Sequence, residues 1–167
     1  ALEDTAALIE GGIDGVQVEN QFDRPFLKPQ DIGPETVAGI TAAVTRIRAS
    51  FQIPVGVNVH LNGVRQAIAV AVGAGCQWVR AFELANAYIS NSGLLEAVGP
   101  EAMRYRSFLR SEQSVMIFGD FHVKHGSHAI TADRSLEEQA EDVQMALADA
   151  VIVTGGATGT APTPAAI

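Results

Sequence analysis

A dense group of polar side chains follows one apolar segment of the sequence. The stretch FGDFHVKHGSH, residues 118–128, holds an aspartate, a lysine and three of the four histidines, directly after the apolar residues 115–118. In an extended chain Asp120, His122 and Lys124 point to one side, because they lie two residues apart. These residue types bind anions, transfer protons or hold metal ions. We therefore interpret the stretch as the rim of a site.

Two chemistries are open for this group. A divalent ion would be held by Asp120, His122, His125 and His128, with Glu19 across the rim, although the spacing matches no standard metal motif. Organic acid–base chemistry would use Asp120 or Glu19 as the base and His122 as the proton shuttle. Lys124 would then bind a phosphate or carboxylate, or form a Schiff base. The second chemistry is preferred, with no assigned metal or other cofactor.

Five short segments rich in β-branched residues predict the strands that position these groups. They alternate with helical patterns, which is typical of βα units around a parallel sheet. Asn62 is a candidate N-cap for the third helix, and Ser135 begins a capping-box pattern. The predicted strands are 15–19, 55–59, 78–82, 115–119 and 150–154, and the predicted helices are 1–10, 34–51, 63–72, 99–109 and 135–147.

The alternation of apolar and polar residues within the strands distinguishes a barrel from an open sheet. In PVGVNVH, residues 54–60, the valines share one side of the strand, and Gly56, Asn58 and His60 share the other. An open sheet of the flavodoxin type needs apolar residues on both faces, whereas a barrel admits polar residues at its inside top. The sequence favours an α/β fold with one incomplete (β/α)8 TIM-barrel domain over residues 1–167, with about strands two to six present. An open flavodoxin-like parallel sheet is the alternative.

The carboxyl ends of the strands bring polar groups to one rim. Long loops at 20–33 and 83–98 follow two strands, and α/β proteins place functional groups in such loops. TGGATGTAP, residues 154–162, either offers backbone N–H groups to an anion or only turns the chain. Arg80 is either a ligand contact or half of an internal ion pair. The predicted catalytic residues are Glu19, Asp120, His122 and Lys124, and the predicted substrate-binding residues are Asn20, Asn58, Arg80, His125, Thr154 and Gly155.

Composition narrows the classes of partner. The 167 residues carry a net charge of −8, so a polyphosphate is repelled and no nucleic-acid partner is expected. The single cysteine, Cys76, excludes an intrachain disulfide and indicates a reducing compartment such as the cytoplasm. No apolar run approaches the roughly 20 residues of an integral membrane segment. Helical periodicity from the first residue predicts a fragment that is truncated at both ends. Such a fragment has unpaired strand edges, so we expect homo-oligomers.

A series of motifs resembles the BtpA/SgcQ family. The motifs are GGIDGVQVEN, PVGVNV, WVRAF, SNSGLLE, MRYR, DFHVKH and ADAVIVTGGATGTAP, and in this order they cover essentially the whole chain. The resemblance implies a TIM barrel related to ribulose-phosphate-binding barrels, in a family named after a cyanobacterial photosystem I biogenesis protein of the thylakoid membrane. The family's site would map onto Glu19, Asn20, Asn58, Asp120, His122, Lys124, His125, Thr154 and Gly155. HLNG and RAFELANAYISNSG depart from the family pattern at the rim.

The polar rim and the resemblance together predict a function. We expect a cytosolic barrel enzyme of small-sugar or sugar-phosphate metabolism, with lyase-, isomerase- or aldolase-like chemistry on a phosphorylated small molecule. The alternative is a non-enzymatic biogenesis or stability factor for a membrane complex, with peripheral membrane association implied for photosynthetic relatives. A third reading is a barrel without activity.

Overall fold

Five parallel strands form one sheet whose spatial order follows the chain, β1-β2-β3-β6-β7. The computed structural model describes residues 1–164 and 167. Each strand begins and ends within two residues of its predicted segment. The strands are β1 Val16–Glu19, β2 Val55–Asn58, β3 Trp78–Ala81, β6 Met116–Asp120 and β7 Ala150–Ile152.

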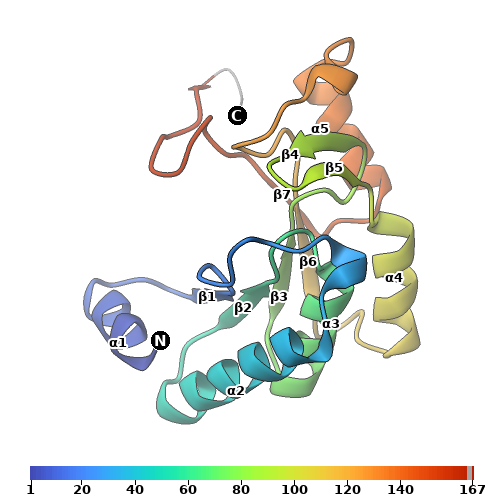
Figure 1. Cartoon of the computed structure of the whole chain (residues 1–167). Coiled ribbons are helices and arrows are strands. Elements are labelled where there is room, and N and C mark those ends of the chain that lie inside the picture. Colours follow the sequence, from blue (N-terminus) through green and yellow to red (C-terminus); the bar gives the residue numbers. More distant parts are fainter. Residues whose placement is uncertain (165–166) are drawn as a thin grey trace.

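Four of the helices, α2 to α5, cover one face of this sheet, and α1 packs against α2 (Figure 1). A flavodoxin-like sheet reverses its strand order and carries helices on both faces, whereas a (β/α) barrel does neither. The barrel-type prediction is therefore confirmed. The barrel is not closed, since β1 and β7 are the outer strands of the sheet in the described part of the chain. The helices are α1 Leu2–Glu10, α2 Pro34–Ser50, α3 Val64–Ala74, α4 Gly99–Phe108 and α5 Leu136–Met145, with 3-10 turns η1 Pro29–Asp31 and η2 Ala129–Thr131.

Local sequence explains two of the helices directly. Pro34 begins α2 at a position that needs no backbone N–H donor, and Ile40, Val44 and Ile47 are buried on one side of it. Ser135 caps α5, because its hydroxyl accepts a hydrogen bond from the backbone N–H of Glu138, whose carboxylate accepts one in return. These signals set where the helices begin.

Asn62 does not cap α3, so that prediction is wrong. Gly63 occupies the N-cap position, and the buried Asn62 amide turns towards the loop after β3 instead. Its Oδ1 accepts a hydrogen bond from the backbone N–H of Glu83, at 3.0 Å, and its Nδ2 donates one to the carbonyl oxygen of the same residue, also at 3.0 Å. One side chain thus ties the end of β2 to the end of β3.

The two faces of the sheet differ as the alternation predicts. Val55, Val57 and Ile117 are fully buried in the core beneath the helices. On the other face Trp78 lies over β2, where a Cβ on Gly56 would come within 2.0 Å of its ring. Glycine is therefore required there by the close approach of the indole. The Trp78 ring also stacks on Phe118, with ring centroids 6.0 Å apart.

The predicted loop 83–98 contains an antiparallel hairpin that the sequence analysis missed. Its strands are β4 Ala87–Ser90 and β5 Gly93–Glu96. The hairpin buries Tyr88 and Leu95 in a second hydrophobic cluster with Leu61, Phe82 and Val123. Backbone hydrogen bonds between Ile89 and Ser127 attach it to the loop after β6. The hairpin therefore lies above the carboxyl ends of the strands (Figure 1).

Candidate functional site

A cavity of about 750 Å³ lies at the carboxyl ends of the strands. All five strand-end loops contribute to its wall, as the barrel-type reading predicts. Glu19 is the last residue of β1, whereas His60 follows β2, Phe82 follows β3, Lys124 follows β6 and Thr158 follows β7. The cavity is therefore one site assembled from segments far apart in the sequence.

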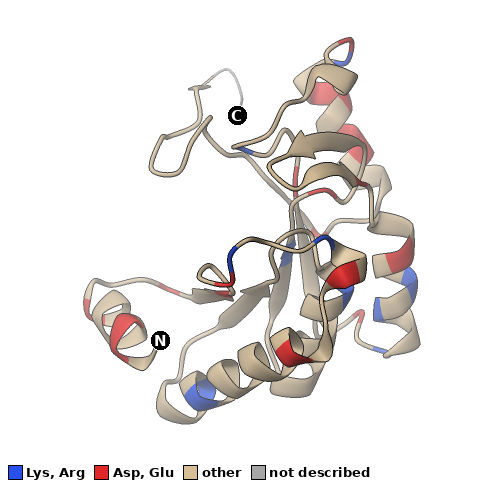
Figure 2. Ribbon diagram, in the orientation of Figure 1, with Lys and Arg blue, Asp and Glu red and all other residues tan. Residues whose placement is uncertain are grey.

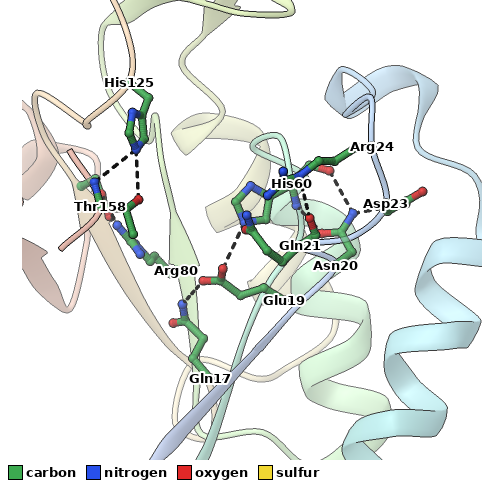
Figure 3. A network of polar contacts seen from close by, with 11 residues as sticks. Gln17, Glu19, Asn20, Gln21, Asp23, Arg24, His60, Arg80, His125 and Thr158 are labelled. Carbon is green, nitrogen blue, oxygen red and sulfur yellow. Dashed lines mark hydrogen bonds and ion pairs between the residues drawn. The ribbon is translucent and has the colours of Figure 1, made fainter. Parts of the chain in front are cut away.

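A carboxylate–imidazole pair stands in this wall. Glu19 Oε2 lies 3.1 Å from His60 Nε2, and Glu19 Oε1 accepts a hydrogen bond of 2.6 Å from Gln17 Nε2. Gln17 in turn accepts one of 3.1 Å from the indole N–H of Trp78. Figure 3 shows Glu19 held between Gln17 and His60 in this way. The chain of contacts fixes both oxygens of the carboxylate.

The pKa of Glu19 lies below its usual value. Burial on its own raises the pKa, but the hydrogen bonds from His60 and Gln17 and the charges of His60 and Arg80 outweigh burial and lower it. Glu19 is thus ionised at neutral pH and able to accept a proton. A carboxylate paired with an imidazole is the usual composition of an acid–base site.

Asn20 holds His60 in place. Its Oδ1 accepts a hydrogen bond of 2.7 Å from the backbone N–H of His60, and its Nδ2 donates one of 3.3 Å to the His60 carbonyl oxygen. The imidazole is stacked on Phe26, with ring centroids 4.6 Å apart, and meets the edge of Phe82 at 4.9 Å. The other ring nitrogen, His60 Nδ1, is buried without a hydrogen-bond partner. The ring is therefore oriented from three sides.

Arg80 and Asp120 form an internal ion pair beneath the cavity. Arg80 Nε and Nη2 donate to the two carboxylate oxygens of Asp120 at 2.8 and 2.7 Å. Asp120 is fully buried; burial raises its pKa, and the charges of Arg80 and Lys124 only partly offset that effect. A two-pronged contact of this kind is the strongest geometry for an arginine–carboxylate pair. Of the two readings of Arg80, the structure shows the ion pair, while the side chain also lines the cavity.

Glu83 is a second buried carboxyl group close to Asp120. It is 4% exposed, and its Oε2 has no hydrogen-bond partner. Burial, with a smaller contribution from the charge of Asp120, raises its pKa to about 8. The charges of Glu83 and Asp120 add to the effect of burial in raising the pKa of Tyr88, which lies on the cavity wall. Glu83 is therefore a protonated acid at neutral pH.

The structure brings only some of the predicted residues to the cavity. Glu19, Arg80, Lys124 and His125 line it. His122 does not, because its backbone has φ = 49° and the chain leaves the extended path directly after β6. The expectation that Asp120, His122 and Lys124 share one face is therefore wrong. His122 instead stacks on His128, with ring centroids 4.0 Å apart.

The remaining predicted residues have other places. Asn58 is buried at the end of β2, opposite Glu19 in the sheet, and its Nδ2 has no partner; the Thr154 hydroxyl is likewise buried without a partner. Gly155 packs closely on the next turn, where a Cβ would come within 2.1 Å of the carbonyl oxygen of Thr160. The close packing of this turn is therefore enough to explain why residue 155 is a glycine.

The metal alternative gains no support. Within residues 1–164 and 167, no group of three or more His, Cys, Asp or Glu side chains could hold a metal ion. His125, one of the candidates, instead places Nε2 3.0 Å from the Thr158 hydroxyl and accepts the Thr158 backbone N–H at 3.2 Å. Asp120, His122 and His125 are thus occupied by different partners.

Several cavity residues are not predicted by the sequence to belong to the site. They are His60, which alternation places at the rim without a role, and Arg24, Phe26, Tyr88 and Thr158. The position of His60 two residues after Asn58 was the available signal. The others lie in loops, where no periodicity indicates which way a side chain points.

Charge is distributed unevenly over the molecule. The cavity wall holds three of the eleven lysines and arginines but only one of the nineteen aspartates and glutamates. Helices α1 and α5 carry carboxylates and no lysine or arginine (Figure 2). Neither Arg24 nor Lys124 forms an ion pair within the described residues, 1–164 and 167. A negative molecule thus has a cavity suited to anions.

Comparisons with known proteins match the whole chain. The sequence model of the BtpA family matches residues 1–167. An uncharacterized protein of Archaeoglobus fulgidus is 38% identical over 159 residues, 95% of this chain and 61% of that protein. Photosystem I biogenesis protein BtpA of Synechocystis is 36% identical over 162 residues, 97% of this chain and 55% of that protein. The chain thus spans little more than half the length of these relatives.

The fold is similar to that of a solved enzyme structure. The 7,8-dihydropteroate synthase from Vibrio fischeri ES114 matches with a TM-score of 0.51, covering 96% of this chain and 58% of that one, at 12% sequence identity. At that identity the similarity concerns the fold alone.

Proposed function

The chain belongs to the BtpA family, and from this premise we propose that it is part of a cytoplasmic enzyme that acts on a small phosphorylated, sugar-like compound. One observation carries the proposal: a strand-end cavity combines cations free of ion pairs with a carboxylate–imidazole pair. Cations bind a phosphate, and the pair transfers a proton, which is what isomerases, lyases and aldolases require.

The cavity residues then divide the work. Lys124 binds the phosphate as a point charge, with the Thr158 hydroxyl in the same wall, and Arg24 is a second cation in the wall. Glu19 takes a proton from the carbon next to a substrate carbonyl. His60 delivers a proton to the substrate's carbonyl oxygen or removes one from it. Asp120 and His122, first expected to be catalytic, receive no contact with substrate in this assignment.

A proton-exchange experiment tests this proposal. We expect the chain, incubated in D2O with ribulose 5-phosphate, to exchange hydrogen for deuterium at a carbon next to the carbonyl, as followed by proton NMR. Glu19→Gln should slow the exchange by about 10²–10⁴-fold, the usual contribution of a general base. Lys124→Gln should weaken substrate binding in a calorimetric titration.

The matched control is Lys28→Gln, since the only other lysine lines a separate cavity of about 460 Å³. That variant should exchange and bind like the parent chain. If neither inorganic phosphate, ribose 5-phosphate nor ribulose 5-phosphate binds, the enzyme proposal is overturned.

A second candidate is a biogenesis factor for a membrane complex. One observation favours it, namely the 36% identity to a protein named for photosystem I biogenesis. No helix among the described residues is long and apolar enough to cross a membrane, so the association would be peripheral. Co-sedimentation with membranes that survives Lys124→Gln and Glu19→Gln would support this candidate over the enzyme.

A further inference from the structure

The cavity wall holds two cations that have no anionic partner. Arg24 lies in the loop after β1 and Lys124 in the loop after β6, and neither forms an ion pair in the part of the chain that the structure describes. The third cation of the wall, Arg80, is bound to both carboxylate oxygens of Asp120. The charge of Arg24 is thus available to a ligand in addition to that of Lys124.

The two cations are too far apart to bind one phosphate group. β2 and β3 lie between β1 and β6 in the sheet, and neighbouring strands are about 4.8 Å apart, so the ends of β1 and β6 lie roughly 14 Å apart along the sheet. The Arg24 side chain is also held in its own loop, where Nε donates a hydrogen bond of 3.0 Å to the carbonyl oxygen of Gln21. Two separate anionic groups are therefore needed to occupy both cations.

The acid–base pair lies between the two cations, and His60 shares a contact with Arg24. Figure 3 shows the Glu19–His60 pair between Arg24 on one side and the loop after β7 on the other. Arg24 and His60 both lie against the Phe26 ring, with the guanidinium carbon 5.9 Å and the imidazole centroid 4.6 Å from the centroid of that ring. An anionic group held by Arg24 thus lies close to His60, the group that acts on the substrate's carbonyl oxygen.

From this geometry we propose that the substrate carries a second anionic group at its carbonyl end, in addition to the phosphate at its other end. Arg24 binds this second group, a carboxylate or a phosphate, because a planar guanidinium donates two parallel hydrogen bonds to either one. The carbonyl beside that group lies at His60, and the rest of the substrate extends to Lys124. The inference rests on the proposed function and specifies the substrate class of the same cavity, a keto compound that is anionic at both ends.

Calorimetric titration with compounds that differ in the second group tests the inference. Ribulose 5-phosphate has one anionic group, whereas ribulose 1,5-bisphosphate has a second phosphate at its carbonyl end and 2-keto-3-deoxy-6-phosphogluconate has a carboxylate there. We expect at least one of the latter two to bind about tenfold or more tightly than ribulose 5-phosphate, which is the usual gain from one charge-assisted contact. The compound that binds more tightly identifies the second group as a phosphate or a carboxylate.

Arg24→Gln removes the charge and keeps a polar side chain at the same place. It should reduce the preference for the compounds with two anionic groups to about twofold or less, because ribulose 5-phosphate makes no equivalent contact. The control is Arg46→Gln, an equal change of net charge at an exposed position of α2 outside the cavity, and it should keep the full preference. Inorganic pyrophosphate has two phosphates that are too close together to reach both cations, so it should bind more weakly than the preferred compound.

The outcomes separate this inference from the enzyme proposal. If ribulose 5-phosphate or pyrophosphate binds the parent chain as tightly as both compounds with two anionic groups, the inference alone is overturned and the enzyme proposal stands. A preference that Arg24→Gln leaves intact has the same meaning. Failure of every one of these compounds to bind overturns both. The comparison on the parent chain decides the question even where Arg24→Gln folds poorly.

Discussion

Glu19 gains its character from the residues that touch it rather than from its own position in the sequence. A glutamate at the end of a strand is common, but here Gln17, His60 and Trp78 form a continuous chain of hydrogen bonds that ends on its carboxylate. Each contact favours the ionised form. The residue types were readable in the sequence, whereas the two 3.1 Å contacts, Glu19 to His60 and Trp78 to Gln17, depend on β1, β2 and β3 lying together in one sheet.

This network gives Glu19 a measurable share in stability. Glu19→Gln removes the charge from a hydrogen-bonded carboxylate and should cost about 1–2 kcal/mol of unfolding free energy at pH 7. The folded-state pKa lies below the usual 4.5, so the stabilisation is present above that pH and is lost as pH falls through the folded-state pKa. Urea denaturation at pH 7 and near pH 3 should show the difference closing. A difference that stays constant with pH would contradict the prediction.

Glu83 has the opposite dependence on pH. Its pKa is raised to about 8, so its proton stabilises the fold fully below about 4.5, and this stabilisation declines as pH rises to 8. Each pH unit in that window is worth up to about 1.4 kcal/mol. Glu83→Gln should therefore match the parent chain near pH 4.5 and exceed its stability by a few kcal/mol at pH 8.

Chemical denaturation at pH 5, 6.5 and 8 measures this effect. The control is Glu3→Gln on the exposed side of α1, which should run parallel to the parent chain. Should Glu83→Gln be less stable than the parent at pH 8, Glu83 would have to be an ionised group with a partner.

At the scale of elements, the strands and helices could be predicted because their patterns are local. Val55, Val57 and Gly56 show the alternation that distinguishes the two faces, and Pro34 and Ser135 mark helix starts. The hairpin at 87–96 could not be predicted in the same way. Its strands are four residues each, and burial of Tyr88 and Leu95 comes from loops that fold over it.

The turn after β6 escaped prediction for a related reason. His122 and His125 have positive φ values of 49° and 63°, which non-glycine residues adopt only where the surroundings require it. Tertiary contacts of the loop, including the stack of His122 on His128, impose that path. Consequently the sequence predicts that this polar cluster lies at the rim, but it does not predict which way each side chain points.

Gly56 provides a test of how closely the sheet is packed on its inner face. Gly56→Ala places a Cβ within 2.0 Å of the Trp78 indole, so the ring must shift and the Gln17 hydrogen bond with it. We expect a loss of about 1–3 kcal/mol, typical of overpacking. Gly39→Ala in α2 is the control, since nothing lies within 4 Å of its Cβ, and it should gain about 0.5–1 kcal/mol. Thermal unfolding of both variants decides the point.

At the scale of the whole molecule, the sheet has two outer strands and an uneven charge. Helices α1 and α5 together carry seven carboxylates and no lysine or arginine, whereas three of the eleven cations line the cavity (Figure 2). An anionic ligand is therefore repelled by the net negative charge of the molecule at long range and attracted by the cavity cations at short range. A higher salt concentration weakens both interactions, and it weakens the repulsion from the exposed carboxylates more strongly.

The strand edges lead to a prediction about association. β7 ends the sheet in the described residues, and Val151 on it is 40% exposed. We propose that the chain self-associates through this edge, and because a charge at an edge strand opposes edge-to-edge pairing, Val151→Lys should weaken this association by roughly tenfold. Sedimentation velocity over a concentration series measures this. Val72→Lys, an equally exposed position on α3, is the control, and an equal effect of both variants would refute an edge contact.

Two asparagines carry a consequence for how this site can change. Asn20 holds the backbone of His60, and Asn62 holds the backbone of Glu83, each through both its amide oxygen and its amide nitrogen. Each asparagine side chain makes the two backbone hydrogen bonds that a neighbouring strand would otherwise make. The loop segments between these contacts are therefore not needed to hold His60 or the buried Glu83 in place. Loops of different length or composition can be exchanged at the rim, so that new ligands are accommodated by evolution or by grafting while the reacting groups stay where they are.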